Sequence, residues 1–117
     1  MATTHMITEV APGVTLFLFT ALAASDAFDF NVPDADEVAF QVLSGSLSGT
    51  VVRMQGSMDG TAFSPLNVPY GLFAAAETTA TNTAVIPCQR SRIYRLAMVG
   101  GTATNISVGV LIRRRVR

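Results

Sequence analysis

The sequence predicts an all-β domain, an antiparallel β-sandwich of about eight strands, for which a jelly roll is one wiring that fits. Short runs rich in Val, Ile, Phe, Thr and Leu recur along the 117 residues, and Gly or Pro separates them. Several runs alternate apolar and polar residues, as strands with one buried face do. No long segment has helical periodicity. We assign residues 14–117 to a single β-sandwich domain and residues 1–13 to an N-terminal extension or arm.

The strands follow from this alternation, taken in chain order. They are expected at residues 14–19, 27–32, 37–43, 49–57, 92–99 and 105–115. In the third of these, Val38, Phe40 and Val42 share one face, and the last strand alternates in the same way from Ile106 to Ile112. The Ala-rich segment 70–82 contains Thr and Asn and predicts a loop with at most one short turn. Residues 100–102 (GGT) are expected to form the last hairpin turn.

Composition indicates that part of the surface is covered by a partner. Half of the residues are hydrophobic and only 14% are charged, whereas about 25% charged residues is usual in globular domains. With few charges to cover a surface, apolar area is expected to be buried against another protein. The chain is therefore predicted to form a homo-oligomer or to belong to a larger assembly.

Charge is distributed unevenly along the chain, although the formal net charge is zero. All eight acidic residues lie between Glu9 and Glu77, where Arg53 is the only basic residue. The other seven arginines follow, and lysine is absent. Such asymmetry lets copies attract one another or a charged scaffold. The alternative is that both signs meet inside one folded domain.

The pair Asp59-Gly60, between two strand-like runs, is a strong hairpin signal. A two-residue type I′ turn needs positive φ at both central residues, which Asp tolerates and Gly adopts freely. The prediction is a tight turn bounded by Ser57, with Phe63 beginning to face the core. The alternative is a calcium or sugar site on Ser57, Asp59 and Thr61. Calcium usually needs six to eight oxygen ligands, so the turn is favoured.

Residue types needed for catalysis are scarce. His5 is the only histidine, Cys88 the only cysteine, and lysine is absent, which argues against a nucleophile–base pair and against His/Cys metal sites. We therefore expect no enzyme activity, no catalytic residue and no cofactor, and no role for Cys88 beyond that of a small buried residue. The remaining carboxylates are expected to be solvated surface groups rather than catalytic acids or bases. A calcium ion near Asp34, Asp36 and Glu37 stays open.

Four arginines near the C-terminus form the most suggestive charged element: Arg113, Arg114, Arg115 and Arg117. The guanidinium fork matches carboxylate geometry, so these residues are candidate contacts to another subunit. Arginines on a terminal strand also limit edge-to-edge aggregation. A nucleic-acid site is disfavoured because aromatic residues are not interleaved and the pI is near 6.5.

The apolar segment 10–24 has two interpretations. It is either a core strand or an arm that docks on another subunit, which makes Phe17 and Phe19 candidate contacts. Its apolar run of 14–24 is too short to span a bilayer, and neither Lys nor Arg precedes it. We therefore expect neither a membrane anchor nor a secretory signal. Tyr70 and Phe73 are further candidate contacts in a loop.

Two segments together carry a resemblance to a known class of proteins. The first is Ser57-x-Asp59-Gly60-x-x-Phe63, and the second is Tyr94-Arg95-Leu96 followed by Gly101-Thr102 and a strand of alternating Val and Ile. Over roughly residues 37–114 the chain resembles small bacteriophage virion β-sandwich proteins. These include capsid decoration (cement) proteins and modules of tails and baseplates.

The resemblance implies a structural role in the virion. A decoration protein would bind and stabilise the assembled head, with the major capsid protein and further copies of itself, as a trimer, for partners. It would act on the capsid surface after assembly in the host cytoplasm. The alternative is a tail or baseplate module that binds a receptor or carbohydrate through exposed aromatic residues. The chain contains no tryptophan, the residue on which sugars often stack. Its absence argues against the carbohydrate-binding alternative.

Overall fold

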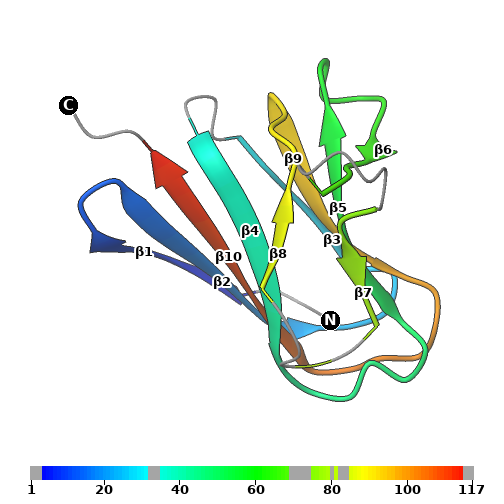
Figure 1. Cartoon of the computed structure of the whole chain (residues 1–117). Helices are drawn as coiled ribbons and strands as arrows, with labels where there is room; N and C mark the ends of the chain where they lie inside the picture. Colours follow the sequence, from blue (N-terminus) through cyan, green and yellow to red (C-terminus); the bar gives the residue numbers. More distant parts are fainter. Residues whose placement is uncertain (1–3, 32–34, 69–74, 80, 82–84, 115–117) are drawn as a thin grey trace.

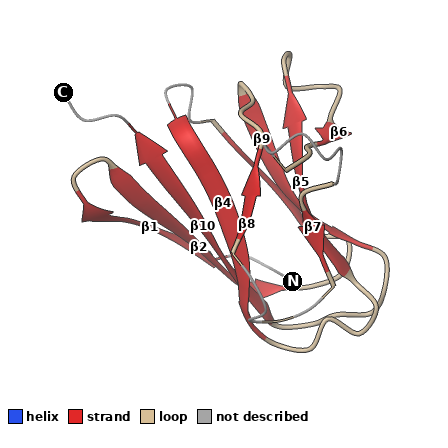
Figure 2. Ribbon diagram, viewed as in Figure 1, coloured by secondary structure: helices blue, strands red, loops and turns tan. Residues whose placement is uncertain are grey.

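The computed structural model describes residues 4–31, 35–68, 75–79, 81 and 85–114, and within these residues it contains strands and loops but no helix (Figure 2). The strands are β1 (Thr4–Ala11), β2 (Val14–Leu22), β3 (Ala27–Phe30), β4 (Ala35–Ser44), β5 (Val51–Ser57), β6 (Ser64–Pro65), β7 (Glu77–Thr78), β8 (Ile86–Cys88), β9 (Ile93–Val99) and β10 (Ile106–Arg114). The predicted all-β fold is confirmed.

The strands form two antiparallel sheets that face each other (Figure 1). Sheet A has the order β1-β2-β10-β4-β8, and sheet B has the order β3-β9-β5-β6, with β7 also paired to β5. Successive strands from β2 to β5, and again from β8 to β10, alternate between the sheets. This is the wiring of a jelly roll, with β1 added at the edge of sheet A.

The core lies between the sheets and uses the faces that alternation predicted. From sheet A, Val38, Phe40 and Val42 are each 1% exposed, and the four apolar residues of β10 that alternate from Ile106 to Ile112 are fully buried. Aromatic rings fill one part of this core. Phe30 stacks on Tyr94 with ring centroids 5.4 Å apart. Such pairs stabilise a core beyond the area that they bury.

The N-terminal segment differs from the predicted arm. Residues Thr4–Ala11 pair antiparallel along β2, and the chain reverses at residues 12–13, where Gly13 has a φ of 76°. The segment is therefore an edge strand of sheet A. In β2 the core interpretation is the correct one for Phe19, which is 3% exposed and cannot serve as a contact. Phe17 is half-buried and packs against Phe30, 5.3 Å between ring centroids.

The turn at Gly100-Gly101 exists, but the predicted hairpin is wrong. It connects β9 in sheet B to β10 in sheet A, so the strands that flank it do not pair. Thr50, fully buried, fixes this connection: its hydroxyl donates to the Gly100 carbonyl (2.9 Å) and accepts from the Ala103 amide (3.0 Å). Local turn chemistry predicts where the chain bends, whereas the sheet that receives the next strand depends on the whole fold.

Candidate functional site

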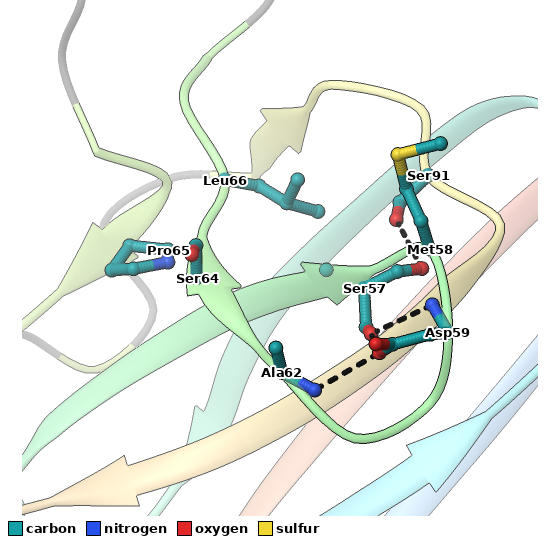
Figure 3. Close-up of a pocket in the computed structure, with 9 residues that line it drawn as sticks. Ser57, Met58, Asp59, Ala62, Ser64, Pro65, Leu66 and Ser91 are labelled. Atoms are coloured by element: carbon teal, nitrogen blue, oxygen red, sulfur yellow. Dashed lines mark hydrogen bonds between the residues drawn. The ribbon is translucent and has the colours of Figure 1, made fainter.

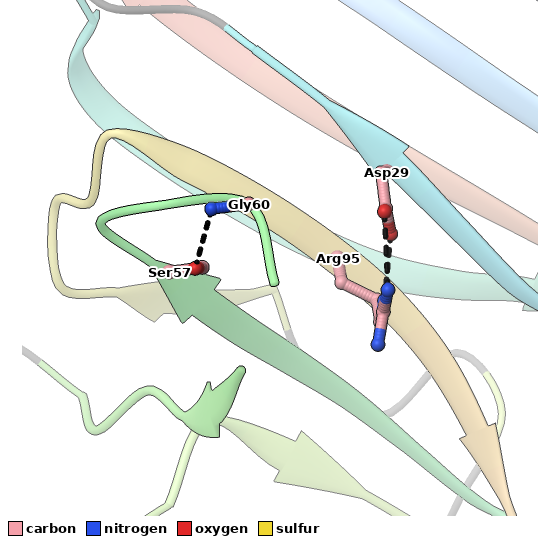
Figure 4. Close-up of polar contacts among 4 residues, drawn as sticks. All are labelled: Asp29, Ser57, Gly60 and Arg95. Atoms are coloured by element: carbon pink, nitrogen blue, oxygen red, sulfur yellow. Dashed lines mark hydrogen bonds and ion pairs between the residues drawn. The ribbon is translucent and has the colours of Figure 1, made fainter. Parts of the chain in front are cut away.

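The loop after β5 is organised by the side chain of Ser57. The register pairs Gly56 with Ser64, which leaves residues 57–63 in the loop. The Ser57 hydroxyl accepts from the backbone N–H of Asp59 (3.2 Å) and of Gly60 (2.9 Å), and it donates to Asp59 Oδ1 (3.0 Å) (Figures 3 and 4). These bonds fix the loop backbone without any ligand.

The Asp59 side chain holds the later part of the same loop. Its Oδ1 accepts from the backbone N–H of Thr61 (2.8 Å) and of Ala62 (3.0 Å). Gly60 has a φ of 81°, but Asp59 does not have a positive φ, so the predicted type I′ turn is wrong. The physical reason is that two side chains, Ser57 and Asp59, supply hydrogen bonds that stabilise a wider loop. The residues were identified correctly and the turn type was not.

The same hydrogen bonds hold Asp59 in its ionised form. The N–H groups of Ala62 and Thr61, and then the Ser57 hydroxyl, lower the pKa of this carboxyl from 3.8 to about 2. Hydrogen bonding to the charged form favours it, so the unfolded chain binds the proton more readily between these values. The stabilising contribution is present above pH 3.8 and is lost as the pH falls through about 2.

We predict that Asp59→Asn flattens this part of the pH dependence. The amide oxygen still accepts from the loop N–H groups, but it does not titrate. Thermal unfolding midpoints of both proteins, measured from pH 2 to 5, should fall toward acid less steeply for the variant. Parallel curves would show that the Asp59 carboxylate does not contribute to acid sensitivity.

Phe63 and Arg95 form a contact on the outer face of sheet B. The guanidinium carbon of Arg95 lies 3.7 Å from the centroid of the Phe63 ring. Arg95 also bonds Asp29 through two atoms, at 2.6 and 3.1 Å (Figure 4). The prediction that Phe63 faces the core is wrong, because Arg95 alternates with buried Tyr94 and Leu96 and so points outward.

The two segments that carry the resemblance are neighbours in the structure. Strand β5 pairs with β9 so that Gly56 lies opposite Tyr94 and Ser57 opposite Ile93. The ion pair of Arg95 with Asp29 joins the basic part of the chain to the acidic part. The ion pair of Arg53 with Glu77 (2.9 Å) lies within the acidic part. Through Arg95 and Asp29 the two parts meet within one domain, as the second interpretation of the charge pattern expects.

Met58 begins this loop, directly after β5, and is 84% exposed. Arg92 Nη1 donates to the Met58 carbonyl (2.6 Å), and Arg90 and Arg92 are both exposed. Together with Ala35 and Ser91 these residues line an open hollow of about 510 Å³. We call Met58, Arg90 and Arg92 the loop end. The sequence interpretation missed it, although an apolar residue beside Asp-Gly was an available signal.

A second hollow, of about 370 Å³, lies behind the loop and is lined by serine residues among others (Figure 3). The side chains of Ser57, Asp59 and Ser91 already have internal hydrogen-bond partners. The Ser91 hydroxyl lies within hydrogen-bond distance of the carbonyls of Ile93 (3.0 Å) and Ser57 (3.3 Å). The hydroxyl groups of Ser57 and Ser91 therefore support the loop and β9, and the carboxylate of Asp59 does the same.

The arginines at the end of β10 lie at the same end of the sandwich as Ala35, which begins the neighbouring strand β4 (Figure 1). Arg113 is exposed, and Arg114 Nη2 bonds Thr15 Oγ1 (3.1 Å). The interpretation of β10 as an edge strand is wrong, since it lies between β2 and β4. Four other candidate contacts lie outside the described residues and stay predictions: Arg115, Arg117, Tyr70 and Phe73.

The part that the structure describes does not assemble the calcium site that the sequence left open. Asp36 and Glu37 are exposed and belong to strand β4, while Asp34 lies outside the described residues. No three His, Cys, Asp or Glu side chains among the described residues are grouped as metal ligands. Cys88 is buried, as predicted, and burial raises the pKa of its thiol to about 12.

No family model matches the chain, and no curated protein is significantly similar to it. In the described ranges, no helix has the length and apolar character needed to cross a membrane.

Proposed function

We propose that this chain is a structural, non-enzymatic protein of a bacteriophage particle, a decoration protein that binds the assembled head and stabilises it. The observation that carries the proposal is the loop end. It presents Met58, 84% exposed, at the same hollow as two exposed arginines, Arg90 and Arg92. An exposed apolar side chain with a charged rim is a common form of protein-binding site.

The loop end is suited to contact because its backbone is already fixed. The bonds from Ser57 and Asp59 hold one side of the loop, and Arg92 holds the carbonyl of Met58. A contact made by preorganised residues loses little conformational entropy on binding. The Ser57 hydroxyl and Asp59 Oδ1 are used internally, which favours a surface that docks on a protein over a pocket that holds a small ligand.

A decoration protein stabilises by binding the assembled shell and not its separate subunits. Such binding favours the assembled state by mass action. The many equivalent sites of a shell allow a modest affinity at each site to have a large total effect. Jelly rolls occur in viral capsid and lectin domains. This analogy agrees with the proposal, but a fold alone does not determine a function.

The proposal predicts that Met58→Asp weakens binding to heads by about tenfold or more, since it places a charge at the contact. The matched control is Ser46→Asp, an exposed substitution in the loop between β4 and β5, at the other end of the sandwich (Figure 1). Heads assembled from the major capsid protein encoded with this chain would be mixed with each variant and sedimented through sucrose. Bound protein would be quantified across a concentration series.

Wild-type and Ser46→Asp proteins should sediment with heads to the same saturation. Failure of the wild-type protein to sediment with heads would refute the function. Equal binding by all three proteins would refute the role of Met58. The alternative of a tail or baseplate module rests on Tyr70, Phe73 and Phe63. Phe63 is half-buried, with the Arg95 guanidinium over its ring. The other two lie outside the described residues, and the alternative stays a prediction.

A further inference from the structure

The outer face of sheet A is largely apolar across its three central strands. Because alternate residues of β2, β10 and β4 are buried in the core, their neighbours point away from it. The polar Gln41 lies on this face. The other residues there, together with Val85 beside β8, are Leu16, Leu18, Ala39, Leu43, Gly109 and Leu111. Val85 is 58% exposed, and among the described residues only Met58 is a more exposed large apolar residue.

A hollow of about 210 Å³ interrupts this face. Gly109 forms its floor, since a Cβ atom there would lie 3.3 Å from Leu43 Cδ1 and 3.4 Å from Leu16 Cδ1. The leucine side chains therefore project from this face, and the hollow at Gly109 is a depression in it. The outer face of sheet B differs, because it carries the ion pairs of Arg95 with Asp29 and of Arg53 with Glu77.

On the outer face of sheet A, each residue of β10 lies beside a residue of β4 that differs from it in size or charge. We call each such pair of neighbours a row. Leu111 lies beside Ala39, and Gly109 lies beside Gln41. In the next row Arg113 lies beside Glu37, and both side chains are exposed. Neither of these two makes an ion pair within the described part of the chain. Each row thus pairs a large residue with a small one, or a base with an acid.

We propose that this face binds a second copy of the chain, across a two-fold axis that runs parallel to the strands between β10 and β4. Such an axis places β10 of one copy over β4 of the other. Leu111 then meets Ala39 of the partner subunit, and Arg113 meets Glu37 of the partner subunit. A two-fold interface requires a self-complementary surface, and these rows are complementary in size and in charge.

The geometry is one that sheets adopt routinely. Two sheets pack face to face about 10 Å apart, with strand directions within about 30° of each other. Residues near the axis stay in register despite this angle, and Arg113 and Glu37 are on the two strands next to it. The two copies therefore associate as a two-fold dimer, whereas the resemblance implies a trimer. The interface residues differ from those of the loop end, and the two surfaces adjoin where Glu37 and Arg90 line one hollow.

The test is the solution mass of the full chain, measured by light scattering after size exclusion and by sedimentation equilibrium. We expect a dimer of the 12.3 kDa chain. Glu37→Arg alone should raise the dimer dissociation constant by about tenfold or more, because two arginines then face each other. Arg113→Glu alone should do the same. The double exchange, Glu37→Arg with Arg113→Glu, should restore the dimer.

Leu111→Glu tests the apolar part of the face, and Val51→Glu is its matched control on the outer face of sheet B. The first should give a monomer with native circular dichroism and the second an unchanged dimer. A wild-type monomer at about 100 μM, a trimer, or a dimer unaffected by both Leu111→Glu and the charge reversals would overturn the proposal. The inference does not depend on head binding, so a dimer that fails to bind heads refutes only the proposed function.

Discussion

Replacing Gly101 with alanine is expected to lower the free energy of unfolding by about 3 kcal/mol or more. Gly101 has a φ of 66°, and a Cβ atom there would lie 2.2 Å from the backbone nitrogen of Thr50 and 2.4 Å from the carbonyl carbon of Gly49. Both neighbours are backbone atoms, so neither can rotate away. Thr50 in turn holds Gly100 and Ala103 by hydrogen bonds that a backbone shift would break.

The adjacent residue provides the control for this experiment. Gly100 has a φ of 67°, but a Cβ atom there would have no other atom within 4 Å. Gly100→Ala should therefore cost only the left-handed backbone strain, about 1 kcal/mol. Urea unfolding of both variants measures the difference. Equal losses for Gly100→Ala and Gly101→Ala would show that the close approach to Thr50 does not limit position 101.

Tyr94→Ala should destabilise the domain by about 3–5 kcal/mol, the usual cost of removing a buried aromatic ring. Tyr94 is fully buried from β9, and its ring stacks on Phe30 at 5.4 Å between centroids. Burial raises the pKa of its hydroxyl, which accepts a hydrogen bond from the Ser91 amide (2.9 Å). Truncation leaves a cavity between the sheets and removes the acceptor from Ser91.

Tyr94→Phe separates these two effects, since it keeps the ring and removes the hydroxyl. It should cost about 1 kcal/mol, the usual contribution of one hydrogen bond. Chemical unfolding of the two variants beside the wild-type protein gives both numbers. If Tyr94→Phe were as destabilising as Tyr94→Ala, the hydrogen bond to Ser91, rather than packing against Phe30, would be the main contribution.

The buried faces of most strands could be predicted because alternation is a local property. Val38, Phe40 and Val42 are separated by residues of a different character, and they enter the core as expected. In β2 the run from Leu16 to Phe19 is apolar throughout, so period-two patterning cannot separate the core face from the outer face. That ambiguity hid the apolar outer face and made Phe19 look available for contact.

Features set by tertiary structure could not be predicted from local pattern. The sequence around Asp59-Gly60 fits a tight turn, but the Ser57 and Asp59 side chains favour a wider loop. Neither the pairing of Thr4–Ala11 with β2 nor the crossing at Gly101 from one sheet to the other is encoded in a short segment. Leu111 and Gly109 on the second face of β10 were an available sign that the outer face of this strand is apolar.

Electron cryomicroscopy of heads incubated with the purified chain tests the proposed function most directly. The account predicts added density on the outer surface of the shell, into which the jelly roll fits with Met58, Arg90 and Arg92 against the capsid. It also predicts that each bound copy has a second copy on the outer face of sheet A. Bare heads at saturating protein concentration, confirmed by sedimentation of the same sample, would contradict the decoration role.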